Sequence, residues 1–162
     1  MIKTARNYLK IASYLLLLVS LGACADNTSV NNLVVQLDVF KSPTCDCCGK
    51  WVSHIDSLGF EATTHHPADL NLVKQKLGIA PQYQSCHTGV SKEGYIFEGH
   101  VPADIMQRFL TEKPEGALGL AVPGMPIGSP GMEMGDRYDD YDVLLLKKDG
   151  SSEVYERIRP KS

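Results

Sequence analysis

The sequence predicts an α/β domain in which a central mixed sheet is flanked by helices and carries one long loop rich in glycine, proline and methionine. Two observations support this fold class. Strand patterns alternate with helical patterns in the first half of the chain, and alternating apolar and polar residues with turn signals follow in the second half. With 162 residues, the chain has room for one ordinary domain and a targeting segment.

The first half predicts two strand-then-helix pairs. The first strand is a β-branched apolar run, and the helix after it places Cys48, Val52 and Ile55 on one face. The second helix ends at Gly78 and has Asp69 in its first turn, where a carboxylate suits the helix dipole. The expected ranges are 33–40 and 60–64 for the strands and 46–58 and 68–77 for the helices.

The second half begins with a predicted β-hairpin and a third helix. Residues 94–100 alternate in polarity next to a turn at 92–94, which predicts the hairpin, and Pro102 suits the first turn of an amphipathic helix over 103–111. Together, these elements follow the order βαβα and then ββα. This is the order of thioredoxin-like domains.

A long loop and a final hairpin complete the domain. Glycine and proline recur throughout residues 114–135, so we expect no regular structure there. Residues 141–158 then predict two strands that turn at Asp149-Gly150.

The N-terminus indicates export. A basic stretch over residues 1–10 precedes an apolar run over 11–23, which is shorter than the ~20 residues of a transmembrane helix. The run ends in Leu21-Gly22-Ala23-Cys24, which resembles the lipobox of bacterial lipoproteins, in which the cysteine is diacylated. The alternative is an ordinary cleaved signal with an incidental cysteine.

These features predict three segments and a location. We expect a signal peptide over 1–23, a lipidated N-terminus and tether over 24–32, and the folded domain over 33–162. The protein would lie in the bacterial periplasm, anchored to a membrane through Cys24. Ala25 and Asp26 favour the outer membrane by analogy.

The charge argues against nucleic acid as a partner. The formal net charge is −3, and it becomes more negative when Lys3, Arg6 and Lys10 are removed with the signal.

Three thiols form the most informative stretch of the chain. Cys45, Cys47 and Cys48 follow the first strand and begin the first helix, where unpaired backbone N–H groups favour thiolates. Thiolates are soft ligands that select Cu(I), zinc or iron–sulfur clusters. Cys86 precedes the third strand, which in a thioredoxin-like domain lies against the cysteine loop. The sequence therefore predicts a soft-metal site at Cys45, Cys47, Cys48 and Cys86, where bridging thiolates would suit several Cu(I) ions in particular.

Several alternatives remain open for these cysteines. Cys45 and Cys48 form a C-x-x-C pair at a helix start, which is typical of thiol–disulfide oxidoreductases. The additional thiol of Cys47 favours a metal-binding protein over such an enzyme. Structural zinc, an iron–sulfur centre and an accessory lipoprotein stabilised by metal are further alternatives. A two-disulfide scaffold is disfavoured because Cys47 and Cys48 are adjacent.

Other donors come later in the chain. His87 follows Cys86 directly, while Met125 and Met132 lie in the loop and carry thioethers that favour Cu(I). For His100, a hydrogen-bonded structural role is the leading interpretation. We expect His54 to face solvent, His65 and His66 to form an exposed connection, and Trp51 to cover the apolar side of the site.

The sequence resembles the CopG-type copper-resistance proteins, exported proteins long described as a domain of unknown function. The resemblance extends over about residues 35–158 and rests on four separated motifs. These are residues 45–51 (CDCCGKW), 85–89 (SCHTG), 94–102 (GYIFEGHVP) and 119–133 (GLAVPGMPIGSPGME).

The resemblance implies a thioredoxin-like fold with a copper-binding cysteine cluster and a role in periplasmic copper handling. Cys45, Cys47 and Cys48 match the C-x-C-C ligands of the family, and Cys86 with His87 matches its second motif. The expected partners are copper ions and other periplasmic copper-handling proteins, and redox cycling of copper is an activity proposed for the family.

Overall fold

The computed structural model describes residues 34–159. The predicted signal peptide, tether and lipidation of Cys24 lie outside this part of the chain. None of the helices between residues 34 and 159 is long and apolar enough to span a membrane.

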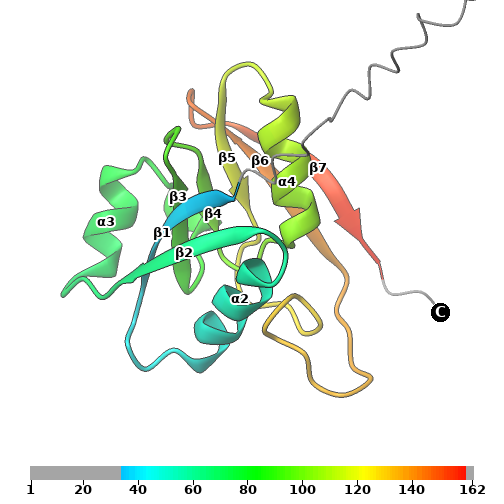
Figure 1. The fold of residues 1–162 in the computed structure, drawn as a ribbon. Helices are drawn as coiled ribbons and strands as arrows, with labels where there is room; N and C mark the ends of the chain where they lie inside the picture. The colour runs from blue at the N-terminus through cyan, green and yellow to red at the C-terminus, as the bar shows by residue number, and fades with distance from the viewer. Residues whose placement is uncertain (1–33, 160–162) are drawn as a thin grey trace, which may run out of the picture. The chain divides into compact units, whose positions relative to one another are not determined.

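A seven-stranded mixed sheet forms the centre of the domain, with strand order β2-β1-β3-β4-β5-β6-β7 (Figure 1). The strands are β1 (Val35–Lys41), β2 (Phe60–His65), β3 (His87–Ser91), β4 (Ile96–Glu98), β5 (Ala117–Ala121), β6 (Tyr141–Lys147) and β7 (Ser152–Ile158). The helices are α2 (Asp46–Asp56), α3 (Leu70–Lys76) and α4 (Ala103–Glu112), with a 3₁₀ turn η1 (Pro81–Tyr83). The predicted α/β class with a mixed sheet is confirmed.

The first half of the chain folds as its pattern predicts. Strands β1 and β2 run parallel and are joined by α2, while β3 pairs with β1 in the antiparallel sense. Asp69 is the N-cap of α3 rather than part of its first turn, and its carboxylate accepts a hydrogen bond from the backbone N–H of Leu72 at 3.0 Å.

The main core lies between one face of the sheet and the two longer helices. Trp51 and Ile55 from α2 and Phe109 from α4 are fully buried, and they belong to one apolar cluster with Phe97 and Leu120 of the sheet. Burial of each such side chain contributes roughly 1.5–3 kcal/mol, which keeps both helices against the sheet.

The prediction of no regular structure over residues 114–135 was wrong in part. Residues 117–121 form β5, which pairs with β4 on one side and β6 on the other. This strand joins the final hairpin to the rest of the sheet. The irregular loop is therefore confined to residues 122–140, apart from an isolated bridge between Met134 and Arg137.

Gly119 explains why the pattern was misleading. A Cβ atom at this position would overlap the backbone of Ile96 in β4. The glycine therefore permits close approach of two strands, although in the sequence it resembles a loop residue.

Gly119→Ala should lower the free energy of unfolding by about 1–3 kcal/mol, because the backbone of Ile96 cannot move aside as a flexible side chain could. Urea unfolding measures this change. Gly49→Ala is the matched control: its Cβ would meet nothing within 4 Å, and alanine should stabilise α2 by roughly 0.5–1 kcal/mol. Equal stabilities for the two variants would contradict the close-packing explanation.

Candidate metal centre

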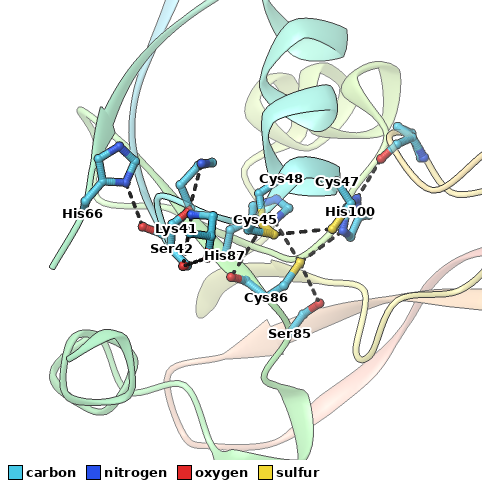
Figure 2. Close-up of a disulfide and its surroundings, with 12 residues drawn as sticks. Lys41, Ser42, Cys45, Cys47, Cys48, His66, Ser85, Cys86, His87 and His100 are labelled. Carbon is cyan, nitrogen blue, oxygen red and sulfur yellow. Dashed lines mark hydrogen bonds between the residues drawn. A yellow bond between two sulfur atoms is a disulfide. The ribbon is translucent and has the colours of Figure 1, made fainter. Parts of the chain in front are cut away.

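Four cysteines from two distant segments meet at one end of the sheet. Their sulfur atoms all lie within 4.8 Å of one another, and Figure 2 shows the side chains pointing toward one another. The four residues are Cys45, Cys47, Cys48 and Cys86. Cys45 is the N-cap of α2, and Cys47 and Cys48 lie in the first turn of that helix. Cys86 directly precedes β3. The fold thus brings together the four thiols that the sequence analysis selected.

The structure describes an oxidised state of this cluster. Cys45 and Cys48 are joined by a disulfide, with Cα atoms 5.4 Å apart, while Cys47 and Cys86 are free as far as the described residues are concerned. The Cys47 sulfur lies 3.4 Å from that of Cys45. In this state two of the four predicted ligands are not thiolates, and they can donate as thiolates only after the disulfide is reduced.

His100 belongs to the same site, which the sequence analysis did not predict. Its Nε2 lies 3.1 Å from the Cys86 sulfur, and its Nδ1 lies 2.8 Å from the carbonyl oxygen of Pro130. Because a carbonyl only accepts hydrogen bonds, Nδ1 carries the proton and the Nε2 lone pair faces Cys86. Fixing the tautomer in this way is typical of metal-binding histidines.

His87 supplies a second imidazole. Its Nδ1 lies 3.3 Å from the Cys86 sulfur, and its buried Nε2 has no hydrogen-bond partner within the described part of the chain. Burial, together with the neighbouring His100 and Lys74, holds the pKa of His87 well below its usual value. The ring is therefore neutral at physiological pH, which is the form that binds metals.

Cys86, His87 and His100 thus form a second group of donors around one shared sulfur, again within 4.8 Å of one another. The two groups share Cys86 and together contain six side chains, four with sulfur donors and two with imidazole donors. His100 lies 14 residues after Cys86 in the sequence, and the hairpin of β3 and β4 brings the two side chains together.

Trp51 covers the apolar side of the site, as its position predicted. Its ring centroid lies 4.2 Å from that of His87, and its Nε1 donates to the carbonyl oxygen of Val101 at 2.9 Å. Trp51 and Cys48 are both fully buried. The inner side of the cysteine cluster is consequently shielded from water.

The loop over residues 122–140 approaches the site through its backbone (Figure 1). A Cβ atom at Gly131 would lie 2.7 Å from the carbonyl oxygen of Cys47, so the loop packs closely on the start of α2. Met125 is 51% exposed, and Met132 is half-buried. Metal binding by these two thioethers stays a prediction.

The remaining histidines have other partners. His54 was expected to face solvent, but it is half-buried, and its Nε2 accepts a hydrogen bond from the backbone N–H of Ala103 at the start of α4. His65 pairs with Asp38 at 2.6 Å, and His66 lies 3.0 Å from the carbonyl oxygen of Lys41. Both belong to the surface near the end of β1 and β2.

Burial also controls the protonation of Cys86. Loss of solvent, followed by the charge of Cys47, raises the pKa of the Cys86 thiol to about 11. At neutral pH the thiol is protonated and can donate to Nε2 of His100. Binding of a metal at this sulfur must therefore release a proton.

In metal-free protein, Cys86 should react with iodoacetamide slowly. At pH 8 a thiol of pKa about 11 contains roughly 100-fold less thiolate than one of pKa 9.0, and only the thiolate is nucleophilic. Mass spectrometry of the Cys86 peptide gives the rate, with urea-unfolded protein as the reference. Cys47→Ser should accelerate the reaction, because it removes the neighbouring charge. A rate that levels off near pH 9 would contradict the raised pKa.

Comparisons with known proteins identify relatives of the chain. Two solved structures, named copper resistance protein CopG form 2 and form 1, are each 42% identical to the chain with a TM-score of 0.73. They match 77% and 78% of this chain, respectively, and 98% of their own length. Residues 83–132 match a family described as protein of unknown function, DUF411. No curated protein sequence matches the chain.

Proposed function

Because the chain belongs to the family of copper resistance protein CopG, we propose that it holds copper(I) in a thiolate cluster formed by Cys45, Cys47, Cys48 and Cys86. Copper-resistance relatives and a cluster of cysteines able to bind metal support a copper-related role. The observation that carries the proposal is the convergence of four sulfurs within 4.8 Å. Copper is the cargo of this site, held for homeostasis or resistance.

The donor set supports copper(I) in particular. Thiolates are soft, and they favour copper(I) over hard cations such as magnesium and calcium. Four sulfurs this close would bridge more than one ion, which supports a multinuclear cluster. His87 and His100 lie beside Cys86 and would add imidazole nitrogen where an ion is not fully surrounded by sulfur.

Loading of the full cluster requires reduction of the Cys45–Cys48 disulfide. Two external thiols, or one dithiol, would supply two electrons and two protons, so that the S–S bond becomes two thiols while the reductant becomes a disulfide. Copper(I) then displaces the thiol protons, including that of Cys86. Redox cycling of copper at the same site is compatible with this chemistry.

The proposal includes a thioredoxin-like assignment for residues 35–112. The strand order β2-β1-β3-β4 supports it, since β1 and β2 are parallel and β3 and β4 are antiparallel neighbours. The position of the C-x-x-C pair at the start of the helix after β1 supports it as well. Strands β5 to β7 extend this unit on one side.

We also propose that the domain is anchored in the periplasm by lipid at Cys24, where other copper-handling proteins would exchange copper with it. The motif Leu21-Gly22-Ala23-Cys24 supports this location. Radiolabelled palmitate should be incorporated by cells that express the wild type and not by cells that express Cys24→Ser. Equal labelling of the two would refute the anchor.

The copper proposal predicts different effects of removing two different thiols. The chain contains five cysteines, and Cys24→Ser and Cys47→Ser each remove one. Anaerobic titration of the reduced full chain with copper(I), against a coloured copper(I) chelator, counts the ions bound. Cys24→Ser should match the wild type, while Cys47→Ser should bind fewer ions because a bridging sulfur is lost. An unchanged count in Cys47→Ser would refute the cluster.

A thiol–disulfide oxidoreductase is the second candidate, and the disulfide between Cys45 and Cys48 favours it. This function needs only these two cysteines, so reduction of insulin disulfides should survive Cys47→Ser and disappear in Cys45→Ser. Absence of such activity in metal-free wild-type protein would exclude it.

A further inference from the structure

Lys74 and Glu98 form a buried ion pair beside the segment that carries Cys86 and His87. The Lys74 ammonium lies 2.5 Å from Oε1 of Glu98, and the two side chains are 2% and 0% exposed. Lys74 is the only residue of α3 that is fully buried. The buried contact of the short helix α3 with the sheet is therefore the ion pair between Lys74 and Glu98.

The carboxylate of Glu98 holds both ends of the segment that carries Cys86 and His87. Its Oε1 accepts a hydrogen bond from the backbone N–H of Ser85 at 2.6 Å, and its Oε2 accepts one from the hydroxyl of Thr88 at 2.5 Å. Ser85 directly precedes Cys86, and Thr88 directly follows His87. Lys74 also donates to the Thr88 hydroxyl at 2.8 Å.

The alternation of side chains along the strands separates this network from the metal centre while keeping the two adjacent. Phe97 belongs to the core beneath α2 and α4, so Glu98, the next residue, points to the other face. Thr88 and Glu98 are cross-strand partners in β3 and β4. His87 directly precedes Thr88 in β3, so it points to the opposite face of the sheet, where it packs against Trp51.

Stability alone is a poor reason for this pair. Moving a lysine and a glutamate out of water costs several kcal/mol per ion, and apolar residues of similar volume are often as stabilising or more so. What apolar residues cannot do is accept the hydrogen bonds of Ser85 and Thr88. The charged pair thus supplies the Glu98 carboxylate as a fixed acceptor for Ser85 and Thr88. These two residues flank the candidate ligands Cys86 and His87.

We propose that Lys74 and Glu98 are positioning residues of the metal centre, which fix the Ser85–Thr88 segment so that Cys86 and His87 meet the cysteines of α2. The inference rests on the proposed copper function and adds residues from α3 and β4 to it. Neither residue touches the ion; both act through the backbone of Ser85 and the side chain of Thr88.

The test compares an apolar pair with a matched core variant. Lys74→Met combined with Glu98→Leu removes the acceptor while leaving no unpaired charge, so it should fold, with a melting temperature lowered by the loss of the Ser85 and Thr88 hydrogen bonds. Its copper(I) affinity, measured by competition with a coloured chelator, should fall about 10–100-fold, as for other residues that orient metal ligands. Phe109→Leu, in the core under α4, should lower the melting temperature and change the affinity by less than about twofold.

Two further measurements keep the outcome decisive. Glu98→Gln retains an oxygen acceptor for Ser85, so it should lose less affinity than the apolar pair, and it serves alone if the pair does not fold. Trp51 is the single tryptophan of the chain and contacts His87, so its emission in metal-free protein should change in the apolar pair and not in Phe109→Leu.

The results separate the two proposals. If the reduced wild type binds no copper(I), the proposed function fails, and Trp51 emission alone decides whether the pair positions His87. If the wild type binds copper(I) and the apolar pair matches it in affinity and emission, the positioning role is overturned. If only Glu98→Gln folds, it decides the question: its amide nitrogen cannot accept the hydrogen bond of the Thr88 hydroxyl, so wild-type affinity and emission in this variant would also overturn the positioning role.

Discussion

The antiparallel pairing of β1 with β3 is the constraint on which the candidate site depends. Its register sets Lys41 opposite His87, so the residues just after β1 lie beside those just before β3. Cys45 begins α2 shortly after Lys41, and Cys86 directly precedes His87. A slip of one residue would turn His87 to the opposite face of the sheet. The sheet thus determines both the distance and the direction of the donors.

Two layers hold this arrangement from opposite sides. Trp51 and the apolar core press on His87 from the α2 side, while Lys74 and Glu98 hold the flanking residues Ser85 and Thr88 from the α3 side. The same burial keeps His87 neutral and the thiol of Cys86 protonated. A metal that binds here therefore replaces a proton in a shielded site and avoids competition with bulk water.

Sequence patterns predicted the parts of the site that are local. The strand, the cysteine turn and the helix of residues 35–56 follow from apolar periodicity, and the soft-donor chemistry of cysteine indicates all four clustered thiols. Strand β5 was missed because Gly119 resembles a loop residue until the backbone of Ile96 is placed against it. The place of His100 in the donor group was not predicted, because its tautomer depends on the carbonyl of Pro130, 30 residues later in the sequence. Contacts between distant segments leave no period in the sequence.

The oxidation state of the Cys45–Cys48 pair changes the kind of metal that the proposed site favours. In the oxidised state the remaining donors are two thiols and two imidazoles, a mixed set that also suits harder ions than copper(I). Reduction adds two thiolates and makes the set rich in sulfur. Cys47 is free in the oxidised state and lies beside Cys45, so it can donate in both states. It would keep a copper ion in place while its neighbours change between disulfide and thiolate, a role that a simple C-x-x-C pair has no residue to fill.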